Sequence, residues 1–131
     1  MTDKKIILAI DDDPLVLGTF TKFLTSDYDL RISKSAADAS ILMDKIKPDL
    51  ILLDIEMPDI SGFEFLHTIK KNPRYMGVPV IIVSGHCEPA FIEHAEKGGA
   101  SAVLAKPVTR EDLYVKISEA FKKPKAGIFG L

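Results

Sequence analysis

The sequence has 131 residues, contains no tryptophan and holds a single cysteine, Cys87. One cysteine cannot form a disulfide within the chain, which suits a reducing compartment such as the cytoplasm. Cys87 also lacks the cysteine and histidine neighbours that a zinc or iron site needs, so we interpret it as a packing residue. Disulfide-stabilised and thiolate-metal proteins are therefore excluded as classes.

Long apolar runs and an excess of charge of one sign are also missing. The longest apolar runs are about five to six residues, whereas a helix that crosses a bilayer needs about 20. The N-terminal residues MTDKK are followed by no apolar segment typical of a signal peptide. A net charge of −2 supplies no broad basic field. We expect a cytoplasmic protein that makes no direct contact with nucleic acid or membrane.

What the chain does have is an average globular composition, with 47% hydrophobic and 27% charged residues. Its length suits one domain, in which short apolar runs alternate with segments of helical period. The expected strands are residues 5–10, 28–33, 49–54, 78–84 and 101–105. The expected helices are residues 14–24, 35–46, 63–72, 89–98 and 109–123. Five strands, each followed by a helix, predict an α/β fold with a doubly wound parallel sheet.

Several helix ends and faces can also be predicted. Asp13 precedes Pro14 and is expected to cap the first helix, and Thr109 is expected to cap the last one. The Gly98–Gly99 pair is typical of a helix C-terminus. In the second helix we expect the large apolar side chains to face the core; these are Ile41, Leu42 and Ile46.

Polar residues follow four of the five expected strands. The first strand runs into Asp11, Asp12 and Asp13, the third ends in Asp54, the fourth in Ser84, and the fifth in Lys106. In an open parallel sheet the carboxyl ends of the strands meet at one edge, where ligands bind. Clustered carboxylates repel one another unless a hard cation such as Mg²⁺ compensates them. A lysine and a hydroxyl opposite them would suit a phosphoryl group, with one carboxylate as nucleophile.

Four short motifs carry a resemblance to a known family. They are IDDDP, LLDIEMPDISG, the Val83–Ser84 pair and the AKP that ends in Pro107. In this order and at these strand ends, they resemble the receiver domain of two-component response regulators, over roughly residues 4–123. The resemblance implies a flavodoxin-like fold with five helices and a five-stranded parallel sheet in the order 2-1-3-4-5.

The resemblance also implies roles for the acidic residues. Asp54 corresponds to the phosphoacceptor, Asp12 to a direct Mg²⁺ ligand, and Asp11 to a neighbour that acts mostly through water. The backbone carbonyl of Glu56 would complete the protein's share of the metal site. Asp13 is interpreted as the helix cap and only a marginal member of the site.

Ser84 and Lys106 take the places of the switch hydroxyl and of the cation that pairs with the phosphoryl group. The Lys106–Pro107 bond is expected to be cis. Family members receive the phosphoryl group from a sensor histidine kinase or a histidine phosphotransfer protein. They then change the surface formed by their fourth helix, fifth strand and fifth helix. We therefore expect a signalling switch whose only chemistry is its own phosphorylation and dephosphorylation, not an enzyme.

Two positions depart from the family pattern or fall where it varies. Val103 stands where many receivers carry an aromatic side chain whose rotation follows phosphorylation, so a muted or differently routed switch is expected. His86 lies two residues after Ser84, where the family tunes the lifetime of the acyl phosphate. It could order a water or shield the phosphoryl group, although an exposed loop histidine is the simpler interpretation.

Three other functions stay open at this point. A phosphohydrolase of the haloacid-dehalogenase type would use Asp11 and Asp13 as its acids. A flavodoxin-like FMN carrier would need a hydroxyl- or glycine-rich phosphate loop after the first strand, where this chain has three carboxylates. A receiver-like binding module could have lost phosphorylation, although the full set of site residues is present.

The domain organisation is expected to be a receiver domain at residues 1–123, followed by a tail or the start of a linker at residues 124–131. The chain is either a stand-alone receiver or the N-terminal part of a longer regulator, and we favour the second. Further expected partners are a second receiver in a homodimer or a downstream effector domain.

Overall fold

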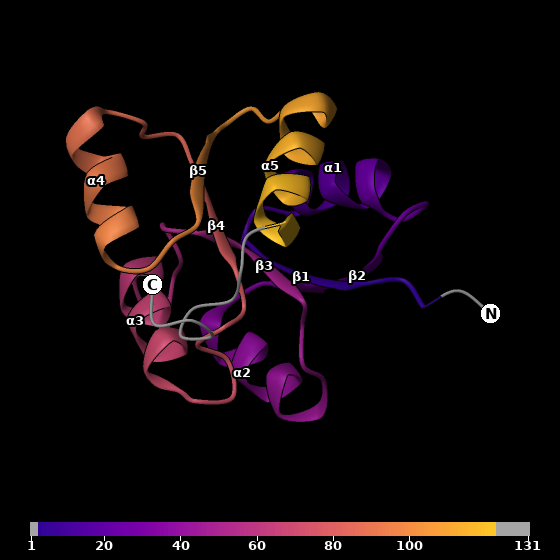
Figure 1. Cartoon of the computed structure of the whole chain (residues 1–131), viewed down its shortest axis with the longest axis horizontal. Helices are drawn as coiled ribbons and strands as arrows, with labels where there is room; N and C mark the ends of the chain where they lie inside the picture. Colours follow the sequence, from indigo (N-terminus) through magenta and orange to yellow (C-terminus); the bar gives the residue numbers. More distant parts are fainter. Residues whose placement is uncertain (1–2, 123–131) are drawn as a thin grey trace.

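The computed structural model describes residues 3–122, in which five strands and five helices alternate along the chain (Figure 1). The strands are β1 (Ile6–Ile10), β2 (Asp29–Ser33), β3 (Leu50–Asp54), β4 (Val80–Ser84) and β5 (Ala102–Ala105). The helices are α1 (Pro14–Leu24), α2 (Ala36–Lys45), α3 (Gly62–Lys71), α4 (Pro89–Lys97) and α5 (Arg110–Lys122). Every expected element is confirmed, with bounds within two residues. The predicted tail at residues 124–131 lies outside the described residues.

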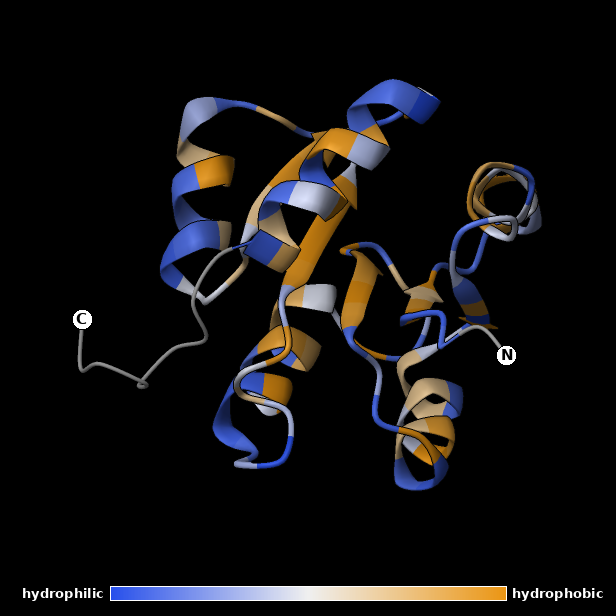
Figure 2. Ribbon diagram, turned by 45° about the vertical axis from the view of Figure 1, so that its right-hand side comes forward, coloured by the Kyte–Doolittle hydropathy of each residue, from blue (hydrophilic) through white to orange (hydrophobic). Residues whose placement is uncertain are grey.

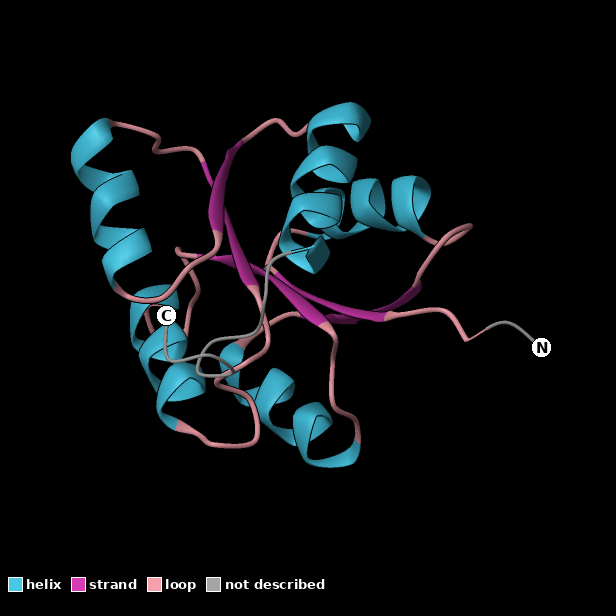
Figure 3. Ribbon diagram, in the orientation of Figure 1, coloured by secondary structure: helices cyan, strands magenta, loops and turns pink. Residues whose placement is uncertain are grey.

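The strands form one parallel sheet in the order β2-β1-β3-β4-β5, as predicted. Helices α1 and α5 lie on one face of the sheet, and α2, α3 and α4 on the other (Figure 3). The chain reverses its winding direction between β1 and β3, so the loops after these two strands diverge and leave a crevice at their carboxyl ends.

Two apolar cores, one on each face of the sheet, hold these layers together. Alternate strand residues enter opposite cores: Leu8 and Ile10 pack with α2 and α3, whereas Ile7 and Ala9 pack with α1 and α5. All five residues of β3 are buried because helices cover both of its faces. The inner strands are accordingly the most hydrophobic part of the molecule, and the helices turn hydrophilic residues outward (Figure 2).

The prediction for the inward face of α2 was only partly right. Ile41 is 60% exposed, and Leu42 and Ile46 are only partly buried. The helix instead buries Ala36, Ala39 and Met43 against the sheet. These residues are spaced i, i+3 and i+7 and form one stripe, and two alanines allow the helix to lie close to the sheet. Ile41 therefore lies on the exposed side of the helix, while Leu42 packs against the core beside this stripe.

The predicted helix ends are confirmed. The Asp13 carboxylate accepts a hydrogen bond from the backbone N–H of Leu15 (2.9 Å), and the Thr109 hydroxyl accepts one from that of Asp112 (3.1 Å). Helix α4 ends at Lys97 with Gly98 as its C-cap, and Gly99 has a φ of +107°, which favours glycine. Within residues 3–122 the helices are 9 to 13 residues long, and none could cross a membrane.

Candidate functional site

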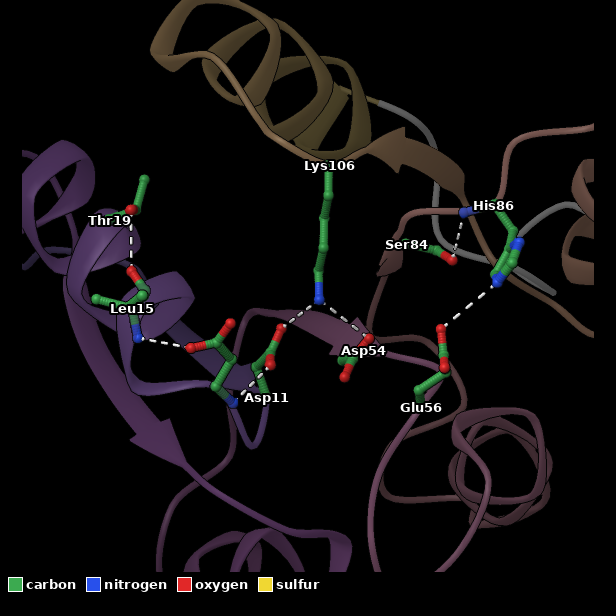
Figure 4. A network of polar contacts seen from close by, with 9 residues as sticks. Asp11, Leu15, Thr19, Asp54, Glu56, Ser84, His86 and Lys106 are labelled. Carbon is green, nitrogen blue, oxygen red and sulfur yellow. Dashed lines mark hydrogen bonds and ion pairs between the residues drawn. The ribbon is translucent and has the colours of Figure 1, made fainter.

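The polar residues predicted at the strand ends meet at one edge of the sheet. Asp11 follows β1, Asp54 ends β3, Ser84 ends β4 and Lys106 follows β5 (Figure 4). Asp11, Asp54 and Ser84 are 1%, 5% and 2% exposed, which is unusual for polar side chains. A buried polar cluster of this kind requires compensation from neighbouring groups or a bound ligand.

Lys106 provides part of that compensation by lying between the two buried carboxylates. Its Nζ is 3.0 Å from Asp11 Oδ2 and 3.3 Å from Asp54 Oδ1. The Lys106–Pro107 peptide bond just after it is cis, as predicted. Only the contact with Asp54 has hydrogen-bond geometry. One cation therefore faces two buried anions, and the cluster keeps an excess of negative charge.

The pKa values of both partners are displaced by this arrangement. Burial and the negative charge of Asp11 raise the pKa of Asp54, although Lys106 opposes the change. Burial by itself lowers the pKa of Lys106, but the contacts with Asp11 and Asp54 outweigh it and raise that pKa. Lys106 is consequently a stable cation, whereas the ionised form of Asp54 is disfavoured until more positive charge arrives.

The carboxylates have the geometry of a cation site. Asp11, Asp12 and Asp54 each place one oxygen within 4.8 Å of the others. Asp11 Oδ1 accepts a hydrogen bond from the backbone N–H of Asp13 (2.9 Å), whereas Asp11 Oδ2 is buried without a hydrogen bond in the described part of the chain. A buried carboxylate oxygen paired only with the Lys106 ammonium, beside two more carboxylates, fits a hard divalent ion such as Mg²⁺.

Asp13 is separated in role from the two acids before it. Its carboxylate caps α1 and is not part of the group of oxygens that approach one another. Glu56 was predicted to contribute its backbone carbonyl, and its side chain points away, being 73% exposed.

The loop between β3 and α3 is held by two residues whose structural roles the motif alone did not reveal. Gly62 donates a backbone hydrogen bond to Ile55 (2.8 Å), and a Cβ at position 62 would come within 2.6 Å of the Ile55 Cα. Asp59 accepts hydrogen bonds from the first backbone N–H groups of α2, Ala36 (3.3 Å) and Ala37 (2.9 Å). The segment after Asp54 is thereby tied to both neighbouring helices.

Ser84 and His86 belong to the loop on the other side of Asp54. The Ser84 hydroxyl accepts a hydrogen bond from the backbone N–H of His86 (3.0 Å), which leaves its own proton free for donation. The His86 side chain is 57% exposed, with its Nε2 3.5 Å from the Glu56 carboxylate and its Nδ1 3.9 Å from that of Glu88. His86 and Glu56 thus face each other across the mouth of the site (Figure 4).

An apolar surface adjoins Lys106 on the opposite side from His86. It combines the start of α1 with the loop between β5 and α5, and its apolar members are Leu15, Val16, Pro107 and Val108. Leu15 is 80% exposed, the highest value among the large exposed apolar side chains of residues 3–122. The sequence signal was an apolar residue directly after Pro14, the first residue of α1; the helical pattern alone gave Leu15 no role.

Val103, which stands where many receivers carry an aromatic side chain, is partly buried. Val103 packs against the core formed with α2, α3 and α4, as Phe63 and Phe91 also do. These two rings lie 5.4 Å apart between α3 and α4. The aromatic side chains in this region therefore come from the helices and not from β5.

Comparison with known proteins agrees with the geometry. The sequence profile described as "Response regulator receiver domain" matches residues 7–118. Two-component response regulator ARR10 of Arabidopsis thaliana is 32% identical over 130 residues, which cover 93% of this chain and 23% of ARR10. The polar-differentiation response regulator DivK of Brucella ovis is 29% identical over 106 residues, covering 80% of this chain and 86% of DivK.

A similar solved structure is that of a CheY-like response regulator receiver domain protein from Methanospirillum hungatei. It is 30% identical, with a TM-score of 0.80, over 89% of this chain and 93% of that one. The chain spans about a quarter of the length of several curated relatives that it matches. The profile match covers most of the chain, from β1 to α5. The chain therefore belongs to the response regulator receiver domain family of two-component signalling.

Proposed function

We propose that this domain is a phosphoacceptor switch of a two-component phosphorelay, in which Asp54 carries the phosphoryl group. The observation that carries the proposal is the position of Lys106, whose Nζ lies within 3.3 Å of both Asp54 Oδ1 and Asp11 Oδ2. A carboxylate at a strand end, beside a cation and an acidic cluster, suits nucleophilic attack on phosphorus. The domain acts on no other substrate; its chemistry is its own phosphorylation and dephosphorylation.

The donor is a phosphohistidine of a sensor histidine kinase or of a histidine phosphotransfer protein. An Asp54 carboxylate oxygen attacks the phosphorus atom, a P–O bond forms, and the P–N bond to the donor imidazole breaks. The electron pair of that bond returns to the imidazole nitrogen, which takes up a proton. Lys106 pairs with a phosphoryl oxygen, and the free proton of the Ser84 hydroxyl is donated to another.

The carboxylates of Asp11, Asp12 and Asp54 and the carbonyl of Glu56 would hold Mg²⁺. Asp11 and Asp12 come from the loop after β1, and Asp54 from the end of β3. When bound, the ion neutralises carboxylate charge and the charge on the transferred phosphoryl oxygens. Asp54 needs that charge because burial and Asp11 raise its pKa and disfavour its nucleophilic form.

The donor protein is expected to dock on the apolar surface beside Lys106. Leu15 and Val16 of α1 and Pro107 and Val108 after β5 border the side of the site where Lys106 lies. A donor must bring its phosphohistidine to Asp54, and an apolar surface at that mouth provides buried contact area for a short-lived complex. Leu15→Ala should therefore weaken donor binding without changing the reaction with a small phosphoramidate.

The output is expected at the surface of α4, β5 and α5. Ser84 ends β4, directly before the loop that leads into α4, so movement of its hydroxyl toward a phosphoryl group is passed to that loop. Val103 cannot sweep out the volume of an aromatic ring. We therefore expect the change to run through the loop at His86 and through Phe91 rather than through the side chain of β5.

Labelling with a phosphoramidate in Mg²⁺ tests the site assignment. Asp54→Asn should abolish incorporation of the phosphoryl group, and Asp11→Asn should slow it while leaving Asp54 as the labelled residue. Asp13→Asn is the matched control, because asparagine also caps helices and should leave labelling near the wild-type level. Labelling that survives Asp54→Asn but is lost in Asp11→Asn would instead support a phosphohydrolase that uses the first acidic loop.

The switch itself can be followed by NMR with Mg²⁺ and beryllofluoride, which mimics an acyl phosphate. Backbone signals of Ser84 and α4 should shift in the wild type and not in Asp54→Asn. A wild-type spectrum that changes only at the metal ligands would contradict a switch and favour a receiver-like binding module.

A further inference from the structure

One edge of the sheet is open. Within residues 3–122, β2 pairs only with β1. The backbone N–H of Asp29 donates to Lys5 (2.9 Å), and the carbonyl of Ser33 accepts from Asp11 (3.1 Å), so residues 29 and 33 face β1. Because a strand alternates its hydrogen-bonding direction, the N–H and C=O groups of Leu30 and Ile32 point away from the sheet. These outward groups can pair with another strand.

The two edges of the sheet are not equally protected. The edge strand β5 has only four residues and is followed closely by Pro107, which has no backbone N–H to donate, and both features discourage strand addition. The edge strand β2 has five residues without proline or glycine, and its Ile32 is 47% exposed. Ile41 of α2, 60% exposed, lines a hollow beside this edge on the α2 side of the sheet. An unprotected edge with exposed apolar side chains is a site for a partner.

The side chains of this edge indicate that the partner is a second copy of the same chain, because the charges of one β2 strand complement those of another in antiparallel orientation. If two β2 strands run antiparallel with Leu30 opposite Leu30, then Asp29 of each copy stands opposite Arg31 of the other. Asp29 and Arg31 lie on the same face of the strand and already pair within one chain, at 2.9 Å. Two opposite-charge pairs, related by the two-fold axis, would form at once.

The side chains on the other face of β2 are also compatible with the register centred on Leu30. Tyr28 of each copy would stand opposite Ile32 of the other, an aromatic and β-branched pair of the kind that stabilises sheets. Ile32 is level with Ala9 of β1, and both Ala9 and Tyr28 belong to the core on the side of α1 and α5. A register centred on Arg31 would instead place the two arginines opposite each other.

We propose that two copies of this chain pair through β2, in the antiparallel register centred on Leu30, to form one continuous sheet. The contact is isologous and closes at two copies. The α2 helices then lie on the same side of the joined sheet. The contact lies at the sheet edge farthest from β5 and does not require phosphorylation of Asp54.

Sedimentation velocity and light scattering over a range of about 10 µM to 1 mM test the proposal. The wild type should form a dimer whose fraction rises with concentration. Arg31→Asp places carboxylates opposite each other across the contact, and Asp29→Arg places guanidinium groups opposite each other. Either change should raise the dissociation constant at least about tenfold. The double exchange Asp29→Arg with Arg31→Asp recreates two opposite-charge pairs and should restore the dimer.

Two control variants distinguish a specific effect on the β2 contact from the general effect of breaking an ion pair. Lys97→Glu breaks an exposed pair with Glu93 on α4 (2.9 Å) and should leave the dimer unchanged, whereas Ile32→Lys should weaken it without altering the far-UV circular dichroism. A chain that stays monomeric at about 1 mM, or forms open-ended oligomers, overturns the proposal. So does a dimer that is insensitive to the single charge changes, because it would use another surface.

Discussion

Asp54 is a buried carboxylate beside a second one, Asp11, and its pKa is raised above the ordinary value of 3.8. A carboxyl whose pKa is higher in the folded than in the unfolded state contributes stability below its unfolded pKa. That contribution is lost as pH rises through the folded pKa. At neutral pH and without a divalent cation, ionised Asp54 therefore destabilises the fold.

Asp54→Asn should consequently raise the free energy of unfolding at pH 7 in metal-free buffer, by on the order of 1 kcal/mol. The gain should shrink as pH falls through the raised pKa of folded Asp54 and should level off below 3.8, where this carboxyl is mostly neutral in the folded and the unfolded state. Urea unfolding at several pH values measures it. Asp44→Asn, at an exposed position of α2, is the control and should change stability by less than about 0.5 kcal/mol. A gain that does not depend on pH would contradict the electrostatic cause.

Lys106 is the positive charge that the buried carboxylates contact. Lys106→Met keeps much of the side-chain volume but leaves Asp11 and Asp54 unpaired, so the free energy of unfolding should fall by about 2–3 kcal/mol in metal-free buffer. Added Mg²⁺ should recover a larger share of stability in this variant than in the wild type. Lys97→Met removes an exposed pair with Glu93 and should cost less than about 1 kcal/mol.

At the scale of the elements, the site depends on how closely α3 approaches the end of β3. A Cβ at Gly62 would meet the backbone at Ile55, which cannot move without displacing Asp54. Gly62→Ala should destabilise the fold by about 2 kcal/mol and reduce labelling of Asp54. Gly18→Ala is the matched control: a Cβ added at position 18 would meet nothing within 4 Å, so the change should stabilise α1 by roughly 0.5–1 kcal/mol. Equal effects of the two changes would mean that the close approach is not required.

At the scale of the whole molecule, a cation that binds only the folded chain should raise its stability. Mg²⁺ at about 100 times its dissociation constant should add about 2.7 kcal/mol to the free energy of unfolding. Asp12→Asn should abolish most of this gain, and Asp13→Asn should keep it, since only Asp12 belongs to the acidic cluster. Thermal unfolding with and without Mg²⁺ measures the difference. A similar loss in both variants would mean that the ion responds only to net charge.

The architecture could be predicted because its signals are local. Apolar runs with β-branched residues mark the strands, and Asp13, Thr109 and Gly99 mark helix ends through hydrogen bonds and backbone angles of their own segments. The alternation of strands and helices then leaves few topologies, and the strand-end rule brings Asp11, Asp54, Ser84 and Lys106 to one edge.

The face of α2 could not be predicted, because either stripe of that helix is apolar enough to be buried. Ala36, Ala39 and Met43 face the sheet since small side chains allow close packing, and Ile41 is left outside. The capping of α2 by Asp59 and the exposure of Leu15 beside Lys106 likewise depend on segments that are distant in sequence.

By itself, the sequence determined the order of elements, the parallel sheet and the identity of the polar residues at its carboxyl edge, because each depends on residue types at short spacing. Only the tertiary structure decided how those residues act on one another. It separates Asp13 from Asp11 and Asp12 and places the Lys106 ammonium between two buried carboxylates. It also leaves the edge of β2 open. Burial, distance and pairing are relations between segments, and chain packing sets them.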